Sequence, residues 1–124
     1  MQSVLIVFLG GGLGSVIRFL LGKWISSLHS HDFPWGTLAA NVTACLLLGL
    51  VVGLADQKQV ISPSMRLFWT VGFCGGFSTF STFSNEILLM MQQGLTGSLL
   101  LYAGFSLLLC VAATFAGLYL GEHL

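Results

Sequence analysis

Long apolar stretches follow one another along nearly the whole chain and are separated by short polar segments. A helix that crosses the apolar core of a bilayer needs about 20 mostly apolar residues. The pattern therefore predicts four membrane-spanning helices, over residues 3–25, 34–55, 64–93 and 98–120. These take up almost all of the chain, so we expect a single all-α transmembrane domain over residues 1–124.

The third stretch departs from this pattern. A straight helix across a core of about 30 Å, rising 1.5 Å per residue, would be shorter than this stretch. Its middle, from Gly72 to Glu86, has the sequence G-F-C-G-G-F-S-T-F-S-T-F-S-N-E. Backbone groups that glycines free at membrane depth must be satisfied by protein or water. We therefore predict a broken helix along a polar path, with the break at the glycines Gly72, Gly75 and Gly76 and extending over Gly75 to Ser78.

Two kinds of ion suit this third stretch. The carbonyl groups freed by a broken helix favour a small cation. The hydroxyl and amide groups between Ser78 and Asn85 suit an anion, as do the positive ring edges of Phe80 and Phe83. The residue pattern alone leaves open which ion moves.

Polar side chains in the second and fourth stretches are candidates for the facing wall of this path. Asn41 follows Thr37 by four residues, so the two share a helix face, and an amide is costly to expose to lipid. In the fourth stretch a polar residue recurs at every fourth position, and the stripe consists of Tyr102, Ser106, Cys110 and Thr114. The same residues could instead serve only as hydrogen bonds between helices.

Glycine pairs and one arginine make further local predictions. Gly10 with Gly14, and Gly49 with Gly53, have the spacing that lets helices approach closely in lipid. Arg18 lies about two turns before the expected end of the first helix, so its charge either snorkels to the interface or pairs inside the protein.

Loop residues give two more expectations. Ser62 is expected to cap the third helix, with Pro63 at the first helical position, where the missing N–H costs nothing. His29 and His31 bracket one serine in the first loop. No third ligand of suitable spacing lies near them, so we expect a solvated loop there rather than a metal site.

Composition agrees with a membrane protein, because 56% of the residues are hydrophobic and only 6% are charged. Soluble domains contain about 25% charged residues. A formal net charge of zero gives no indication of nucleic-acid binding. Cys45, Cys74 and Cys110 lack metal or redox spacing and are expected to be buried packing residues. No catalytic constellation or phosphate-binding loop is evident, so an enzyme is not expected.

Positive charges barely fix the orientation in the membrane. With four spans, both termini and the second loop lie on one side, which holds Lys58 and Arg66. The other side holds Lys23, together with Arg18 if that residue snorkels. So weak a bias under the positive-inside rule permits both orientations, and a dimer of opposed subunits is a candidate arrangement.

Three motifs resemble the bacterial fluoride channels (Fluc, also called CrcB-type). They are G-G-G-L-G-S-V-I-R-F at Gly10 to Phe19, W-G-T-L-A-A-N-V at Trp35 to Val42, and G-F-C-G-G-F-S-T-F-S-T-F at Gly72 to Phe83. The resemblance covers essentially the whole chain. It implies an antiparallel, dual-topology homodimer in the bacterial inner (cytoplasmic) membrane, with two pores that export fluoride ions passively and so protect the cell from fluoride toxicity.

The resemblance also implies roles for individual residues. It implies a fluoride pore lined by Asn41, Phe80, Ser81, Thr82, Phe83, Tyr102, Ser106 and Thr114. It implies a structural sodium ion held by the backbone carbonyls of Gly75 and Ser78, and a structural role for Arg18. The chain differs from the family at Ala44 and Leu46, where glycine and phenylalanine are usual. It also has Cys110 where serine is common and Ser78 where threonine is frequent.

Two other functions are compatible with four short spans. A small dual-topology, proton-coupled multidrug transporter needs an acid inside the membrane, usually early in the chain. The first stretch has none, and Glu86 comes late. A non-transporting membrane assembly subunit would explain the glycine pairs but would leave the Ser/Thr/Phe run without a role.

Overall fold

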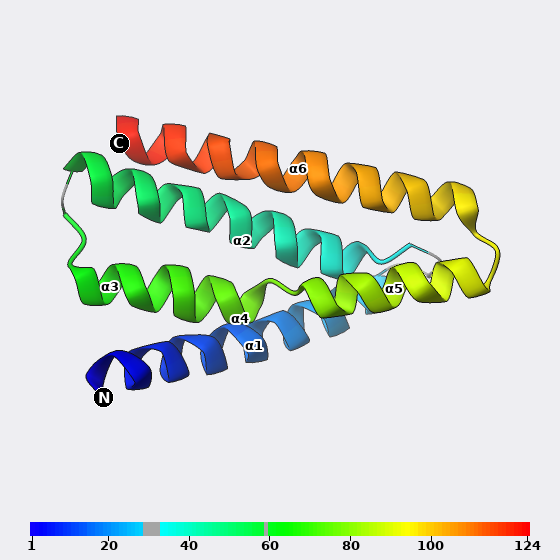
Figure 1. Cartoon of the computed structure of the whole chain (residues 1–124), viewed down its shortest axis with the longest axis horizontal. Coiled ribbons are helices and arrows are strands. Elements are labelled where there is room, and N and C mark those ends of the chain that lie inside the picture. Colours follow the sequence, from blue (N-terminus) through cyan, green and yellow to red (C-terminus); the bar gives the residue numbers. More distant parts are fainter. Residues whose placement is uncertain (29–32, 59) are drawn as a thin grey trace.

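The computed structural model describes residues 1–28, 33–58 and 60–124, and all regular structure in this part of the chain is helical (Figure 1). The elements are α1 (Gln2–Leu28), α2 (Trp35–Gly53), η1 (Leu54–Lys58), α3 (Pro63–Leu67), η2 (Phe68–Cys74), α4 (Gly75–Phe77), α5 (Phe80–Gln92) and α6 (Thr96–His123). The predicted all-α class is confirmed. His29 and His31 lie outside the described residues.

Three helical segments are long and apolar enough to cross a membrane, namely Gln2–Leu28, Trp35–Asp56 and Thr96–His123. The third expected stretch is instead a series of shorter pieces, from α3 through the wider π-helical segment η2 and the short α4 to α5. These pieces follow one another along the bundle, and the two chain ends lie at the same end of it (Figure 1).

The helix break lies at Ser78 and Thr79. Ser78 has φ −83° and ψ 157°, and Thr79 has φ −152° and ψ 120°, so both are extended. The prediction of a break over Gly75 to Ser78 is confirmed at Ser78, but it is wrong for Gly72, Gly75 and Gly76, because all three glycines lie within helical segments.

Two of these glycines, Gly72 and Gly76, serve close packing instead of breaking the helix. A Cβ atom on Gly72 would lie 3.1 Å from the Cα of Gly10, and one on Gly76 would overlap the carbonyl oxygen of Gly11. Gly14 is buried in the same way against the backbone of Phe73. The predicted close contact at the first glycine pair is therefore confirmed, and its partner is the first half of the broken series.

Helices α2 and α6 run parallel and pack closely along their length (Figure 1). A Cβ on Gly49 would overlap the carbonyl oxygen of Thr114, and one on Gly53 would lie 2.6 Å from the carbonyl oxygen of Leu118. The predicted contact at the second glycine pair is thus confirmed. Both pairs join residues 65 positions apart, which defines the register of this α2/α6 seam.

Helix ends follow ordinary capping chemistry. The Ser62 hydroxyl accepts a 3.2 Å hydrogen bond from the backbone N–H of Met65, and Pro63 is the first residue of α3. The predicted cap is confirmed. Gly94 follows α5 with φ +73°, a left-handed conformation that glycine adopts without strain and that closes the turn into α6.

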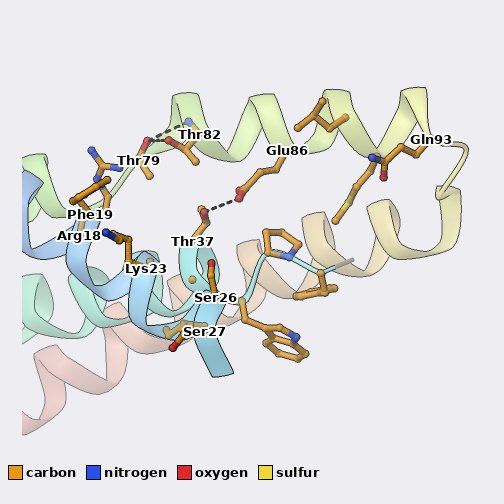
Figure 2. A pocket seen from close by; sticks show the side chains of 18 residues that line it. Arg18, Phe19, Lys23, Ser26, Ser27, Thr37, Thr79, Thr82, Glu86 and Gln93 are labelled. Atoms are coloured by element: carbon orange, nitrogen blue, oxygen red, sulfur yellow. Dashed lines mark hydrogen bonds between the residues drawn. The ribbon is translucent and has the colours of Figure 1, made fainter. Parts of the chain in front are cut away.

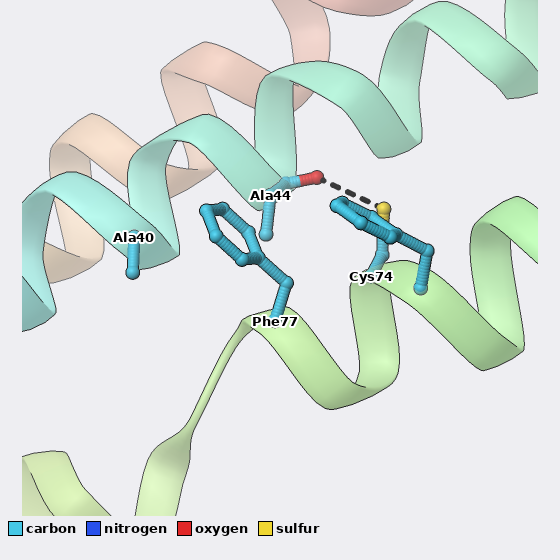
Figure 3. Close-up of a cluster of buried hydrophobic side chains, with 5 residues drawn as sticks. Ala40, Ala44, Cys74 and Phe77 are labelled. Carbon is cyan, nitrogen blue, oxygen red and sulfur yellow. Dashed lines mark hydrogen bonds between the residues drawn. The ribbon is translucent and has the colours of Figure 1, made fainter. Parts of the chain in front are cut away.

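A buried cluster joins α2 to the first half of the broken series (Figure 3). It consists of Ala40, Ala44, Phe73, Cys74 and Phe77. The small side chains of Ala40 and Ala44 leave room for the rings of Phe73 and Phe77, whose centroids are 5.4 Å apart. This cluster holds the start of the break against α2.

The cysteines differ in burial. Cys74 is buried, as predicted, and its thiol lies 3.5 Å from the carbonyl oxygen of Ala44. Cys45 and Cys110 are only half-buried, so the prediction of full burial is wrong for these two. Their side chains lie on the α2/α6 seam rather than in the cluster described above.

Candidate functional site

Asn41 clamps the helix break. Its side-chain oxygen accepts a 2.8 Å hydrogen bond from the N–H of Thr79, and its amide nitrogen donates a 3.2 Å bond to the carbonyl oxygen of Thr79. The expectation that Asn41 faces protein or water is confirmed. A carboxamide nitrogen carries two N–H groups, so the second one is not needed for this clamp.

Thr79 also caps the helix that follows the break. Its hydroxyl accepts a 3.1 Å bond from the N–H of Thr82 and lies 3.0 Å from the Thr82 hydroxyl. The Ser81 hydroxyl lies 3.4 Å from the Thr79 hydroxyl. Three hydroxyl groups therefore gather at the start of α5.

These interactions deprive two carbonyl groups of their usual helical partners. In a continuous helix Gly75 would accept from the N–H of Thr79, and Ser78 from that of Thr82. The N–H of Thr79 instead bonds to Asn41, and the N–H of Thr82 bonds to the Thr79 hydroxyl. Both deprived residues line a small hollow of about 140 Å³.

Arg18 satisfies a third carbonyl group at the break. Its Nε donates a 3.3 Å hydrogen bond to the carbonyl oxygen of Gly76. The Ser15 hydroxyl lies 3.5 Å from the same oxygen. Of the two alternatives for this arginine, the structure supports pairing inside the protein.

Glu86 joins three helices through its carboxylate. It accepts a 2.9 Å hydrogen bond from the Thr37 hydroxyl and a 2.8 Å bond from the Tyr102 hydroxyl. Sequence reasoning did not assign this residue a role. The helical spacing offered a signal, because Glu86 follows Thr82 by four residues and so shares its face of α5.

An open cavity of about 850 Å³ connects these groups (Figure 2). Arg18 contributes a positive group to its wall, Glu86 a negative one, and Thr37, Thr79 and Thr82 contribute hydroxyl groups. In Figure 2 the Thr37 hydroxyl points to Glu86 across the space between α2 and α5. The cavity is therefore polar where it reaches the helix break.

Two phenylalanine rings continue from this region along α5. The ring centroids of Phe80 and Phe83 are 5.6 Å apart, and those of Phe83 and Tyr102 are 5.0 Å apart. Phe83 is half-buried, whereas Phe80 is 78% exposed. The outer ring thus stands on the surface of a single chain.

The polar stripe of α6 lies along the α2/α6 seam. Tyr102 is fully buried. The Ser106 hydroxyl is buried and has no hydrogen-bond partner within the described residues. Thr114 donates a 3.0 Å bond to the carbonyl oxygen of Cys110 in its own helix. Tyr102 reaches the cavity through Glu86, whereas Thr114 lies further along the seam, beside Gly49.

The fold and this site define a small helical membrane protein with a cavity beside a broken helix, lined by both polar and apolar side chains. The family model described as "CrcB-like protein, Camphor Resistance (CrcB)" matches residues 5–118, and the chain belongs to this family. The chain is 43% identical to a "Fluoride-specific ion channel FluC" of Agrobacterium fabrum, over 100% of this chain and 99% of that protein. It is also 43% identical to a protein of the same name from Phocaeicola vulgatus, over 98% of this chain and 100% of the relative. The family resemblance found in the sequence is confirmed.

Proposed function

We propose that this protein is a fluoride channel that releases fluoride passively across the bacterial inner membrane and so reduces fluoride toxicity. The observation that carries the proposal is the similarity, over the full length of the chain, to relatives named fluoride-specific ion channels. These relatives are named as channels rather than as enzymes.

The pore is lined by hydrogen-bond donors and aromatic ring edges. Fluoride is small and tightly hydrated, so a selective path must replace its lost water with closely spaced protein groups. The second amide N–H of Asn41, which the bonds to Thr79 do not use, and a series of hydroxyl groups supply donors, and phenyl rings supply positive edges. The pore residues are Asn41, Phe80, Ser81, Thr82, Phe83, Tyr102, Ser106 and Thr114.

The broken series from α3 to α5 is the third membrane span in chain order. Together with α1, α2 and α6 it makes up a single four-helix domain. The second half of the broken series carries exposed polar residues, including Ser81, Ser84 and Asn85. Such groups are costly to expose to lipid. A second copy of the chain covers them, and the exposed ring of Phe80 faces that copy. The pore walls therefore come from both subunits of a homodimer.

A structural sodium ion fits the carbonyl groups freed at the break. The oxygens of Gly75 and Ser78 have lost their helical partners, as described above. Carbonyl oxygens are hard ligands and suit a small hard cation. A Cβ added to Gly75 would meet no atom within 4 Å, so this face is open for a second copy to complete the ligand set.

Efflux from loaded phospholipid vesicles tests the function directly. Vesicles that contain the purified chain and fluoride are expected to release fluoride without an imposed proton gradient, as measured with a fluoride electrode. Release that requires a proton gradient would favour the transporter, and the absence of release would favour the assembly subunit.

Three further arms of this assay test the site. Chloride-loaded vesicles should release no chloride, because donors spaced for fluoride do not fit a larger halide. Replacing sodium with N-methylglucamine on both sides of the membrane is expected to reduce fluoride release. Unchanged release would contradict the proposed sodium site.

Phe83→Ile should slow fluoride release by at least about tenfold, equivalent to 1.4 kcal/mol in the barrier. Unchanged fluoride release from this variant would show that the Phe83 ring does not contribute to the fluoride path.

Labelling in cells tests the opposed orientation of the two subunits. A Thr96→Cys variant, in a background without the three native cysteines, places one thiol at the exposed start of α6. An impermeant maleimide is expected to label about half of the chains in intact spheroplasts, as two-fold pairing of opposed copies requires, and all chains after permeabilisation. Labelling of all chains, or of none, in the intact spheroplasts would contradict opposed subunits.

A further inference from the structure

The α2/α6 seam keeps one register over at least four helical turns. Thr37 and Tyr102, which both bond to Glu86, are 65 positions apart, as are Gly49 and Thr114, whose backbones meet. Residues between these two levels that share the same offset must therefore face one another. Cys45 and Cys110 have this offset and lie one turn before the glycine contact.

The side chains of this cysteine pair are close to each other. The helix backbones are in contact one turn further on, which leaves little space between facing side chains at the level of the cysteines. The two thiols are near enough to influence each other electrostatically. Both cysteines are free and only half-buried, so small reagents can reach them.

Cys74 is the alternative partner for Cys45, because both line the small hollow. Its thiol is buried and lies against the carbonyl oxygen of Ala44, within the cluster shown in Figure 3. Cys74 lies on η2 rather than on α6, so it is not part of the register that places Cys45 and Cys110 at one level. The pair across the seam is therefore the one that the packing of α2 on α6 brings face to face.

We propose that Cys45 and Cys110 form a binding site for a soft, two-coordinate metal ion, for which mercuric ion is the probe. Thiolate sulfur is the protein ligand that soft metals prefer. In the described part of the chain, no group of three or more His, Cys, Asp or Glu side chains is placed to hold a metal. A metal ion that binds only two ligands does not need such a group, and the two cysteines are sufficient for it.

A divalent metal ion suits a pair of thiolates inside the membrane, because the charges of the ion and of the two thiolates cancel. Neutral mercuric chloride crosses lipid and reacts with the two thiols. Each S–H bond breaks as an Hg–S bond forms, and two chloride ions and two protons leave. The product, a mercury atom between two thiolates, carries no net charge, so it avoids the cost of a buried ion. No oxidation or reduction takes place. One turn before Cys110 on the seam lies the buried hydroxyl of Ser106, which has no hydrogen-bond partner among the residues that the structure describes, so the site adjoins the polar stripe.

Retention of mercury against a monothiol tests the site independently of fluoride transport. The full-length chain in detergent is loaded with mercuric chloride, washed with excess 2-mercaptoethanol, and analysed for mercury per chain by mass spectrometry. We expect one mercury atom per wild-type chain to survive the wash and to be removed by a dithiol chelator. The second sulfur binds intramolecularly, which strengthens retention by about 10²–10⁴-fold over a single thiol.

Three variants identify the ligands. Cys45→Ser and Cys110→Ser should each lose mercury to the monothiol, whereas Cys74→Ser should retain it. Cys110→Ser introduces the residue common at this position in the family, and circular dichroism confirms that each variant keeps its helices. Loss of mercury from the wild-type chain in the monothiol wash would overturn the proposal, and so would its retention by Cys110→Ser or its loss from Cys74→Ser.

Discussion

Replacement of Asn41 by alanine is expected to abolish fluoride release and to destabilise the fold strongly. The substitution removes both hydrogen bonds to Thr79: the backbone N–H of Thr79 loses its partner, and the carbonyl group, which as the N-cap carbonyl of α5 also accepts within the helix, loses one of its two. Each buried group left without a partner costs about 1–3 kcal/mol. Without the clamp, the extended conformation at the break loses its support, and the donors that it aligns no longer face one path. Unfolding in mixed SDS micelles, followed by circular dichroism, and vesicle efflux measure the two effects.

Thr43→Val provides the matched control for this substitution. Thr43 lies two residues further along the same helix, and its side chain is exposed. Valine keeps the shape and replaces the hydroxyl with a methyl group, and the position is exposed, so stability should change by no more than about 0.5 kcal/mol. A stability change in Asn41→Ala as small as that of the control would show that the clamp is not needed to hold the break.

Gly49→Ala is expected to be the most damaging single-methyl change in the chain. The added carbon would overlap the carbonyl oxygen of Thr114 and lie 2.7 Å from the backbone nitrogen of Leu118. Neither backbone can move without separation of α2 and α6, so the strain should cost about 1–3 kcal/mol or more. Unfolding in mixed SDS micelles measures this loss. The facing pairs of the α2/α6 seam should also separate, and mercury retention at the cysteine pair should fall in the same variant.

Gly12→Ala and Gly104→Ala are controls of identical chemistry. Both glycines lie in long helices, and a Cβ added to either would meet no atom within 4 Å. Alanine is favoured over glycine in a helix interior by about 0.5–1 kcal/mol, so these variants should be unchanged or slightly more stable. If Gly49→Ala behaved like them, the seam would not be as tightly packed as the structure indicates.

Hydrophobic periodicity and family motifs were enough to predict the helical class and the fact that the third stretch is broken. They failed on the position of the break, because glycine has two opposite uses in a membrane helix. It can free the backbone, or it can bring two helices into contact. Only the facing residues, such as Gly10 and Gly11 on α1, decide between these uses. A single sequence does not show which residues face one another.

Glu86 was missed for a related reason. Its two hydrogen bonds come from Thr37 and Tyr102, which are 49 and 16 residues away. Each of the three residues shares a helix face with a predicted pore residue, but the sequence does not reveal that the three faces converge. The clamp between Asn41 and Thr79 is equally long-range, so its polarity was predictable and its backbone partner was not.

The parallel course of α2 and α6 has a consequence for biosynthesis. The glycine face of α2 is synthesised well before its partner helix, which begins only at Thr96. The nearest backbone atoms to a Cβ on Gly49 or Gly53 all belong to α6. The seam therefore closes only when α6 has entered the membrane, and a nascent chain that stops before Thr96 retains an uncovered face in the bilayer.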